Sequence, residues 1–229
     1  MPTERFASKL AGWSLISAAA GFIATFSYLA ARFEYPEVLD GTASVVLPRL
    51  LELGSTGRAV WVIYAFLPLL LIPAAIGANR TLGKTAPGRM QGALVAAVIA
   101  AVAMFLGLAR WPSVHWELAR AFLAGSADAK FAIAAVFGGL NTYLGNYIGE
   151  FLGEFALNAF FMLSGSALVA DGQKAAGRLG MVAGVVGWVA AFRNVTAVVA
   201  PIAALNNYVL PLCLIGLGVV LARHRATDR

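Results

Sequence analysis

Four long stretches of this chain, residues 10–31, 59–78, 90–109 and 202–222, contain no Asp, Glu, Lys or Arg. An α-helix needs about 20 apolar residues to cross the hydrocarbon core of a bilayer, which is about 30 Å thick. Each stretch therefore predicts a transmembrane helix. The composition agrees, because 12% of the residues are charged and 60% are hydrophobic, whereas a soluble domain carries about 25% charged residues.

Two further spans are expected where the sequence is less uniform, within residues 131–170 and 179–198. The prediction is an all-α, polytopic membrane helix bundle that forms a single domain over residues 1–229. Its spans lie at about residues 10–31, 59–78, 90–109, 147–170, 179–198 and 202–222.

The distribution of charge predicts the orientation of these spans. With both termini in the cytoplasm, the cytoplasmic segments hold ten basic and three acidic residues, a balance of +7. The outer side then holds seven basic and eight acidic residues, a balance of −1. This asymmetry follows the positive-inside rule. A seventh span would instead place Arg223, Arg225 and Arg229 outside. The net charge of +6 thus belongs to loops beside the spans, and we expect no nucleic-acid partner.

The connections on the outer side, residues 32–58 and 110–146, are much longer than the cytoplasmic ones. Residues 45–53 and 115–123 within them have the pattern of short amphipathic helices on the outer membrane surface. Long ordered connections on one face usually carry function. We therefore expect any site to open outward.

Residues 141–158 carry the most informative pattern. Residues four apart lie on one face of an α-helix, so three stripes of different chemistry run along this segment. The stripes are polar (Thr142, Asn146, Glu150, Glu154 and Asn158), small (Gly145, Gly149 and Gly153) and aromatic (Tyr143, Tyr147, Phe151 and Phe155). The small stripe predicts close packing against another helix.

Two carboxyl groups within a span cost a few kcal/mol each if they are ionised without a partner. At 1.5 Å per residue, Glu154 and Arg193 lie at matching depths, about 10 Å and about 9 Å below the outer surface. We therefore predict that they pair or share a pocket. The candidate ligand-binding residues are Glu150, Glu154, Asn146, Asn158, Arg193, Asn194, Asn207, Tyr64 and Tyr147. A purely structural role stays open, because such groups often only hold helices together.

Known catalytic and metal-binding motifs are missing from the sequence. It contains neither H-E-x-x-H nor G-x-S-x-G, and His115 and His224 belong to opposite sides of the predicted bundle. The single cysteine, Cys213, excludes a disulfide within the chain and a cysteine-based metal site. We predict no catalytic residue, no metal site and no cofactor.

The motif F-E-Y-P at residues 33–36 directly follows the first span, and G-E-F-L-G occupies residues 149–153. With these motifs the chain resembles a bacterial family of small multi-pass membrane proteins whose function is unknown. The resemblance implies the same topology and a place in the bacterial cytoplasmic (inner) membrane, but no reaction. It adds Glu34 to the candidate residues, at the outer mouth of the pocket. Alternatively, Pro36 only ends the helix and Tyr35 anchors it at the interface.

Three classes of function remain open. The first is a protein that binds or translocates a small polar or cationic solute with Glu150, Glu154 and Arg193 in an outward-facing pocket. The second is a sensory, regulatory or structural subunit of a membrane complex, and the third is an intramembrane acid–base enzyme. The expected partners are the lipid bilayer and, in the first class, a small-molecule solute. The sequence leaves both a homo-oligomer and a hetero-oligomer open.

Overall fold

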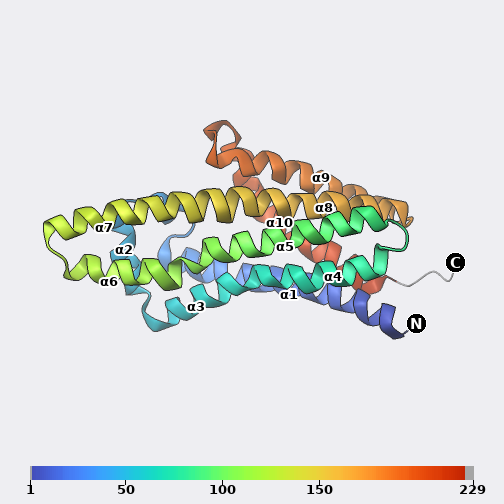
Figure 1. The fold of residues 1–229 in the computed structure, drawn as a ribbon, viewed down its shortest axis with the longest axis horizontal. Helices are drawn as coiled ribbons and strands as arrows, with labels where there is room; N and C mark the ends of the chain where they lie inside the picture. The colour runs from blue at the N-terminus through green and yellow to red at the C-terminus, as the bar shows by residue number, and fades with distance from the viewer. Residues whose placement is uncertain (1, 225–229) are drawn as a thin grey trace.

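Long apolar helices dominate the structure. The computed structural model describes residues 2–224, and within them it has helices and no strands (Figure 1). Six helical segments are long and apolar enough to cross a membrane: Arg5–Phe33, Gly54–Leu82, Pro87–Ala124, Ala127–Ala170, Lys174–Asn194 and Ala197–Arg223. The predicted all-α polytopic bundle is confirmed.

The described residues form ten α-helices and short 3-10 or π segments, of which α2 and η1 lie between the first and second spans. The α-helices are α1 (Pro2–Phe33), α2 (Ala43–Glu52), α3 (Gly54–Phe66), α4 (Leu71–Leu82), α5 (Pro87–Ala109), α6 (Trp116–Ala124), α7 (Ala127–Leu140), α8 (Gly153–Ala170), α9 (Lys174–Ala191) and α10 (Ala200–Arg223). The 3-10 segments are η1 (Glu37–Asp40), η2 (Leu67–Leu70), η5 (Phe192–Asn194) and η6 (Ala197–Val199), and the π segments are η3 (Trp111–His115) and η4 (Asn141–Leu152). The second span changes to a 3-10 turn at η2 because Pro68 has no amide hydrogen to donate to the α-helical ladder.

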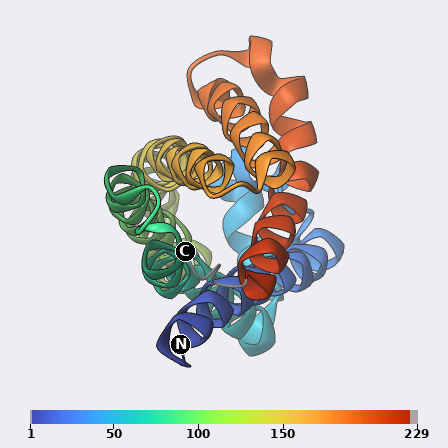
Figure 2. The same ribbon diagram turned by 90° about the vertical axis from the view of Figure 1, so that its right-hand side faces the viewer.

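The spans form a ring. Each span packs against the next one in the chain, and α10 closes the ring against α1 (Figure 2). At the end of the bundle that holds both termini, Gly12 and Gly218 lie so close that a Cβ on Gly12 would be 2.4 Å from the Gly218 carbonyl oxygen. The Ser8 hydroxyl donates to the Leu221 carbonyl nearby. Both ends of the described chain therefore lie on the same side, as an even number of spans requires.

The third and fourth spans are much longer than their predicted apolar cores. They contain 38 and 44 residues, or about 57 Å and 66 Å of helix at 1.5 Å per residue. The helix expected at 115–123 is present as α6, but it continues the third span instead of lying across the bundle (Figure 1). The helix passes Pro112 within the π segment at Trp111–His115, and residues 113–124 contain neither Gly nor Pro, so it ends only at Gly125.

These extensions form an outer layer with the helix expected at 45–53, which is present as α2. We call α2, α6, α7 and η1 the outer layer. It lies at the end of the molecule opposite the termini (Figure 1), and a second hydrophobic cluster that includes Leu47, Trp111 and Trp116 holds it to the spans. Residues 225–229, with Arg225, Asp228 and Arg229, lie outside the described residues, and the predicted orientation stays a prediction.

Candidate functional site

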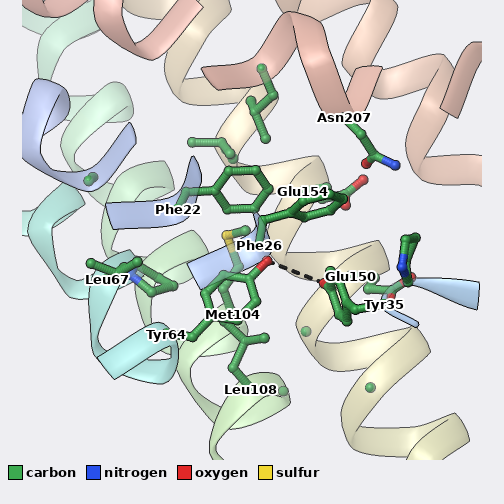
Figure 3. A pocket seen from close by; sticks show the side chains of 18 of the residues that line it. Phe22, Phe26, Tyr35, Tyr64, Leu67, Met104, Leu108, Glu150, Glu154 and Asn207 are labelled. Atoms are coloured by element: carbon green, nitrogen blue, oxygen red, sulfur yellow. Dashed lines mark hydrogen bonds between the residues drawn. The ribbon is translucent and has the colours of Figure 1, made fainter. Parts of the chain in front are cut away.

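A cavity of about 180 Å³ lies inside the ring of spans, and Figure 3 shows side chains that line it. All six spans contribute to its wall. The lining residues include Phe22 and Phe26 of α1, Tyr64 and Leu67 of the second span, Met104, Leu108 and Arg110 of the third, Glu150, Glu154 and Leu157 of the fourth, Arg193 of the fifth, and Asn207 and Leu210 of α10. One part of the wall is apolar and aromatic, and the other carries charge.

The charged part is organised around Arg193. Its guanidinium donates to both carboxylate oxygens of Glu154, each at 2.6 Å, and to Glu150 Oε2 at 3.0 Å. The Asn194 side-chain amide donates to the same oxygen of Glu150 at 3.3 Å. The predicted pairing of Glu154 with Arg193 is therefore confirmed, and Glu150 joins the pair.

Glycines in η4 and at the start of α8 determine how close this helix comes to the third span. A Cβ on Gly149 would lie 2.8 Å from the Gly107 Cα, a Cβ on Gly153 would meet the Met104 side chain, and a Cβ on Gly145 would meet the Arg110 guanidinium. The close packing predicted for the small stripe is confirmed. This contact holds Glu150, the residue after Gly149, at the edge of the cavity.

Arg110 is a site residue that the sequence did not single out. It is 5% exposed and donates to Asn141 Oδ1, at 3.0 Å from Nη2, and to the Gly107 carbonyl. Its guanidinium lies 5.0 Å from the centre of the Trp111 ring. The sequence placed Arg110 in an outer connection because it follows a charge-free span, whereas the helix continues past it.

The segment between α1 and α2 covers the outer end of the cavity, and we call Tyr35, Pro36 and Leu39 the cap. The hydroxyls of Tyr35 and Tyr64 share a hydrogen bond of 3.2 Å (Figure 3). The Asn141 side chain donates to the Leu39 carbonyl at 3.1 Å, so the cap is connected to the fourth span. Burial raises the pKa of Tyr35 to about 12.

Of the predicted site residues, five line the cavity: Glu150, Glu154, Arg193, Asn207 and Tyr64. Asn194 does not line it but holds Glu150.

The other four candidates lie elsewhere. Asn146 is half-buried outside the cavity wall, and Tyr147 is 48% exposed beside Phe151. Asn158 is buried against Gly187 of α9 and donates to the Glu154 carbonyl at 2.8 Å. Glu34 is exposed and pairs with Arg49.

The cavity wall therefore brings two carboxylates and two guanidinium groups together with several aromatic rings. The rings of Phe22, Phe26, Tyr35 and Tyr64 contact one another in mostly edge-to-face pairs, with centroids 5.2 to 6.0 Å apart. Within residues 2–224, no group of three or more His, Cys, Asp or Glu residues is placed to hold a metal ion. The chemistry that the wall offers is ion pairing, hydrogen bonding and contact with aromatic rings.

The fold and this site define a polytopic α-helical membrane protein with a polar cluster inside its bundle. Comparison with protein-family models, with curated proteins and with solved structures gives no match. The resemblance to a bacterial family of unknown function therefore stays a prediction.

Proposed function

We propose that this membrane protein binds a small organic cation with an apolar body in its central cavity. The observation that carries the proposal is the sharing of Arg193 by two carboxylates, Glu150 and Glu154, beside an aromatic wall. Charged side chains within spans are costly, and where they occur they usually mark a ligand or ion site.

The two carboxylates are not held equally. Glu154 accepts two hydrogen bonds of 2.6 Å from Arg193, whereas Glu150 accepts one of 3.0 Å. The Glu150 side chain is 30% exposed and that of Glu154 12%. A ligand ammonium group can therefore replace the contact to Glu150 while the Glu154–Arg193 pair stays intact. Glu150 is the proposed cation-binding group.

The rest of the wall suits the apolar body of such a ligand. An ammonium group over an aromatic face within about 6 Å gains about 0.5–2 kcal/mol, and Tyr35, Tyr64 and Trp111 lie on the wall with Phe22 and Phe26. Drug-sized ligands occupy pockets of about 300–1,000 Å³. A cavity of about 180 Å³ fits a smaller molecule.

The second candidate is a sensory subunit, and one observation favours it. The π segment that carries Glu150 is continuous with α7 of the outer layer, so a ligand on Glu150 touches the helix that extends outward. A sensory role would also require ligand binding at Glu150, so it is compatible with the proposed function. The proposed location of the protein is the bacterial cytoplasmic membrane, which the charge asymmetry of the loops and the family resemblance support.

Thermal stability in nanodiscs tests the proposal with butyltrimethylammonium as the probe. A ligand that binds only the folded state stabilises it by about 2.7 kcal/mol at 100 times its Kd, so the wild-type melting temperature should rise with probe concentration. Glu150→Gln should abolish the rise. Glu117→Gln is the matched control, because Glu117 is exposed and pairs with Arg58 and Arg120 outside the cavity.

The control variant should respond like the wild type. An unchanged melting temperature of the wild-type protein across the probe series would contradict the proposal, and so would an equal response of the two variants.

A further inference from the structure

We infer that the ligand enters the cavity from the bilayer, through a gap between α1 and the outer half of α10, and is therefore a lipophilic cation with an alkyl or aryl tail. This inference rests on the proposed function and specifies its ligand class.

The two helices that border this gap meet at one end only. At the end near the termini, Gly12 and Gly218 are in backbone contact. Toward the outer layer, α10 tilts away from α1 and follows α9, so the two helices separate (Figures 1 and 2). In the ring of spans, α1 and α10 are thus in close contact at the end near the termini and farther apart at the end near the outer layer.

The cavity reaches this gap. Phe22 and Phe26 of α1 form one side of the wall there, and Asn207 and Leu210 of α10 form the other. Asn207 is exposed although it lines the cavity, so the cavity meets the surface beside this residue. Figure 3 shows the Asn207 side chain above Glu154 and Tyr35 in that view.

The surface around the opening is apolar. Ala204, one helical turn from Asn207 on α10, is exposed, and Ile23, next to Phe22 on α1, is 45% exposed. Large exposed apolar side chains on a membrane-spanning helix contact lipid, because the hydrocarbon is as apolar as they are. The opening therefore faces the hydrocarbon of the bilayer rather than water.

The route from the water outside is covered. The cap residues Tyr35, Pro36 and Leu39 lie over the outer end of the cavity, Tyr35 is bonded to Tyr64, and Asn141 holds Leu39 from the fourth span. A ligand that came from the water would have to displace these contacts. A ligand already dissolved in the bilayer would not.

This route has a measurable consequence for affinity. Each CH₂ group moved from water into hydrocarbon gains about 0.8 kcal/mol, which is about fourfold in an equilibrium constant. If the tail stays in the gap, affinity referred to the aqueous concentration should keep rising with tail length, even for tails too long for a cavity of about 180 Å³.

The test measures displacement of radiolabelled butyltrimethylammonium from nanodisc-embedded protein by butyl-, octyl- and dodecyltrimethylammonium, with empty nanodiscs subtracted. Affinity should rise about fourfold per CH₂ group through the series. Ala204→Trp fills the gap, because Ala204 is exposed one helical turn outward from Asn207. It should weaken dodecyltrimethylammonium by about tenfold or more and butyltrimethylammonium by less than about threefold.

Leu212→Trp is the matched control, because it adds an indole on the lipid-facing side of the same helix, and it should change neither affinity. Affinity that stops rising after the butyl compound would overturn the inference and leave the proposed function standing, and so would equal effects of the two Trp substitutions. Failure of butyltrimethylammonium itself to bind the wild-type protein would overturn the proposed function.

Discussion

Gly107 and Gly149 bring the backbones of the third and fourth spans into direct contact. A Cβ on Gly149 would lie 2.8 Å from the Gly107 Cα, and a Cβ on Gly107 would lie 2.6 Å from the Gly149 Cα. Real Cβ atoms essentially never approach so closely. Because Glu150 follows Gly149, the contact that packs the bundle also positions the proposed cation-binding carboxylate.

Gly149→Leu is expected to destabilise the protein. Overpacking a tight site costs about 1–3 kcal/mol, and the opposing atoms are backbone, which cannot rotate away. Gly138→Leu is the matched control, since Gly138 is in the same span but a Cβ there would meet nothing within 4 Å. Thermal unfolding in detergent, followed by circular dichroism, checks the pair, and equal melting temperatures would show that η4 is packed differently.

Replacing one member of the Glu154–Arg193 pair should lower the stability of the protein more than replacing both members. Loss of one partner of a buried pair typically costs about 3–5 kcal/mol, whereas replacing both with apolar residues is often close to neutral. Arg193→Gln should be the more harmful single change, because it strands Glu154 and Glu150, whereas Glu154→Gln leaves Arg193 its bond to Glu150.

The double variant Glu154→Leu/Arg193→Leu should recover the part of that loss that comes from Glu154, while Glu150 keeps its hydrogen bond from Asn194. Denaturant unfolding of Glu154→Leu, Arg193→Leu and the double variant measures the coupling between the sites. Additive effects would mean that the two side chains do not interact in the membrane.

Tyr35 should make the stability of the protein sensitive to high pH. Burial raises its pKa to about 12, from an ordinary value of 10.0. Between these values the unfolded chain has lost the proton and the folded chain keeps it, so stability falls as the pH rises, by about 1.4 kcal/mol per pH unit.

Tyr35→Phe should therefore lose less stability than the wild type between about pH 10 and pH 12. Tyr208→Phe serves as the comparison, because Tyr208 is 72% exposed, and it should follow the wild-type curve. Chemical denaturation at stepped pH values measures the three curves. If all three coincide, the Tyr35 hydroxyl is not buried in the folded protein.

The predicted orientation can be tested by labelling single cysteines in a Cys213→Ser background. Lys174→Cys lies at the first residue of α9 and Ser126→Cys at the turn between α6 and α7, and both positions are exposed. A membrane-impermeant maleimide added to intact cells should label position 126 but not position 174. The reverse pattern would invert the topology and place the cap on the cytoplasmic side.

The sequence predicted the features that depend on long runs of residues. Charge-free stretches predicted the spans, and counting residues from the outer surface placed Glu154 level with Arg193. The polar stripe was only partly informative, because its four-residue spacing assumes an α-helix. Residues 141–152 form a π segment with i to i+5 bonding, so Asn146 and Tyr147 leave the faces that an α-helix would give them.

Two site residues needed the three-dimensional structure. Arg110 joins the cavity because the third span continues past it and past Pro112, a residue that from the sequence indicates a helix end. Tyr35 joins it because the chain folds back after α1, which brings its hydroxyl to Tyr64 on a different span. Both depend on contacts between segments distant in the sequence, and the F-E-Y-P motif that contains Tyr35 does not indicate its contact with Tyr64.

α7, η4 and α8 form one unbroken helix of 44 residues. A small bend of this helix near the cavity would therefore produce a large displacement of its outer end. The turn at Ser126 lies about 36 Å along this helix from Glu150, so a bend of about 10° at Glu150 would displace the turn by about 6 Å. That displacement is about twice the diameter of a water molecule, about 2.8 Å. A change at the cavity would thus move the turn at Ser126, where a molecule that never enters the membrane could detect the movement.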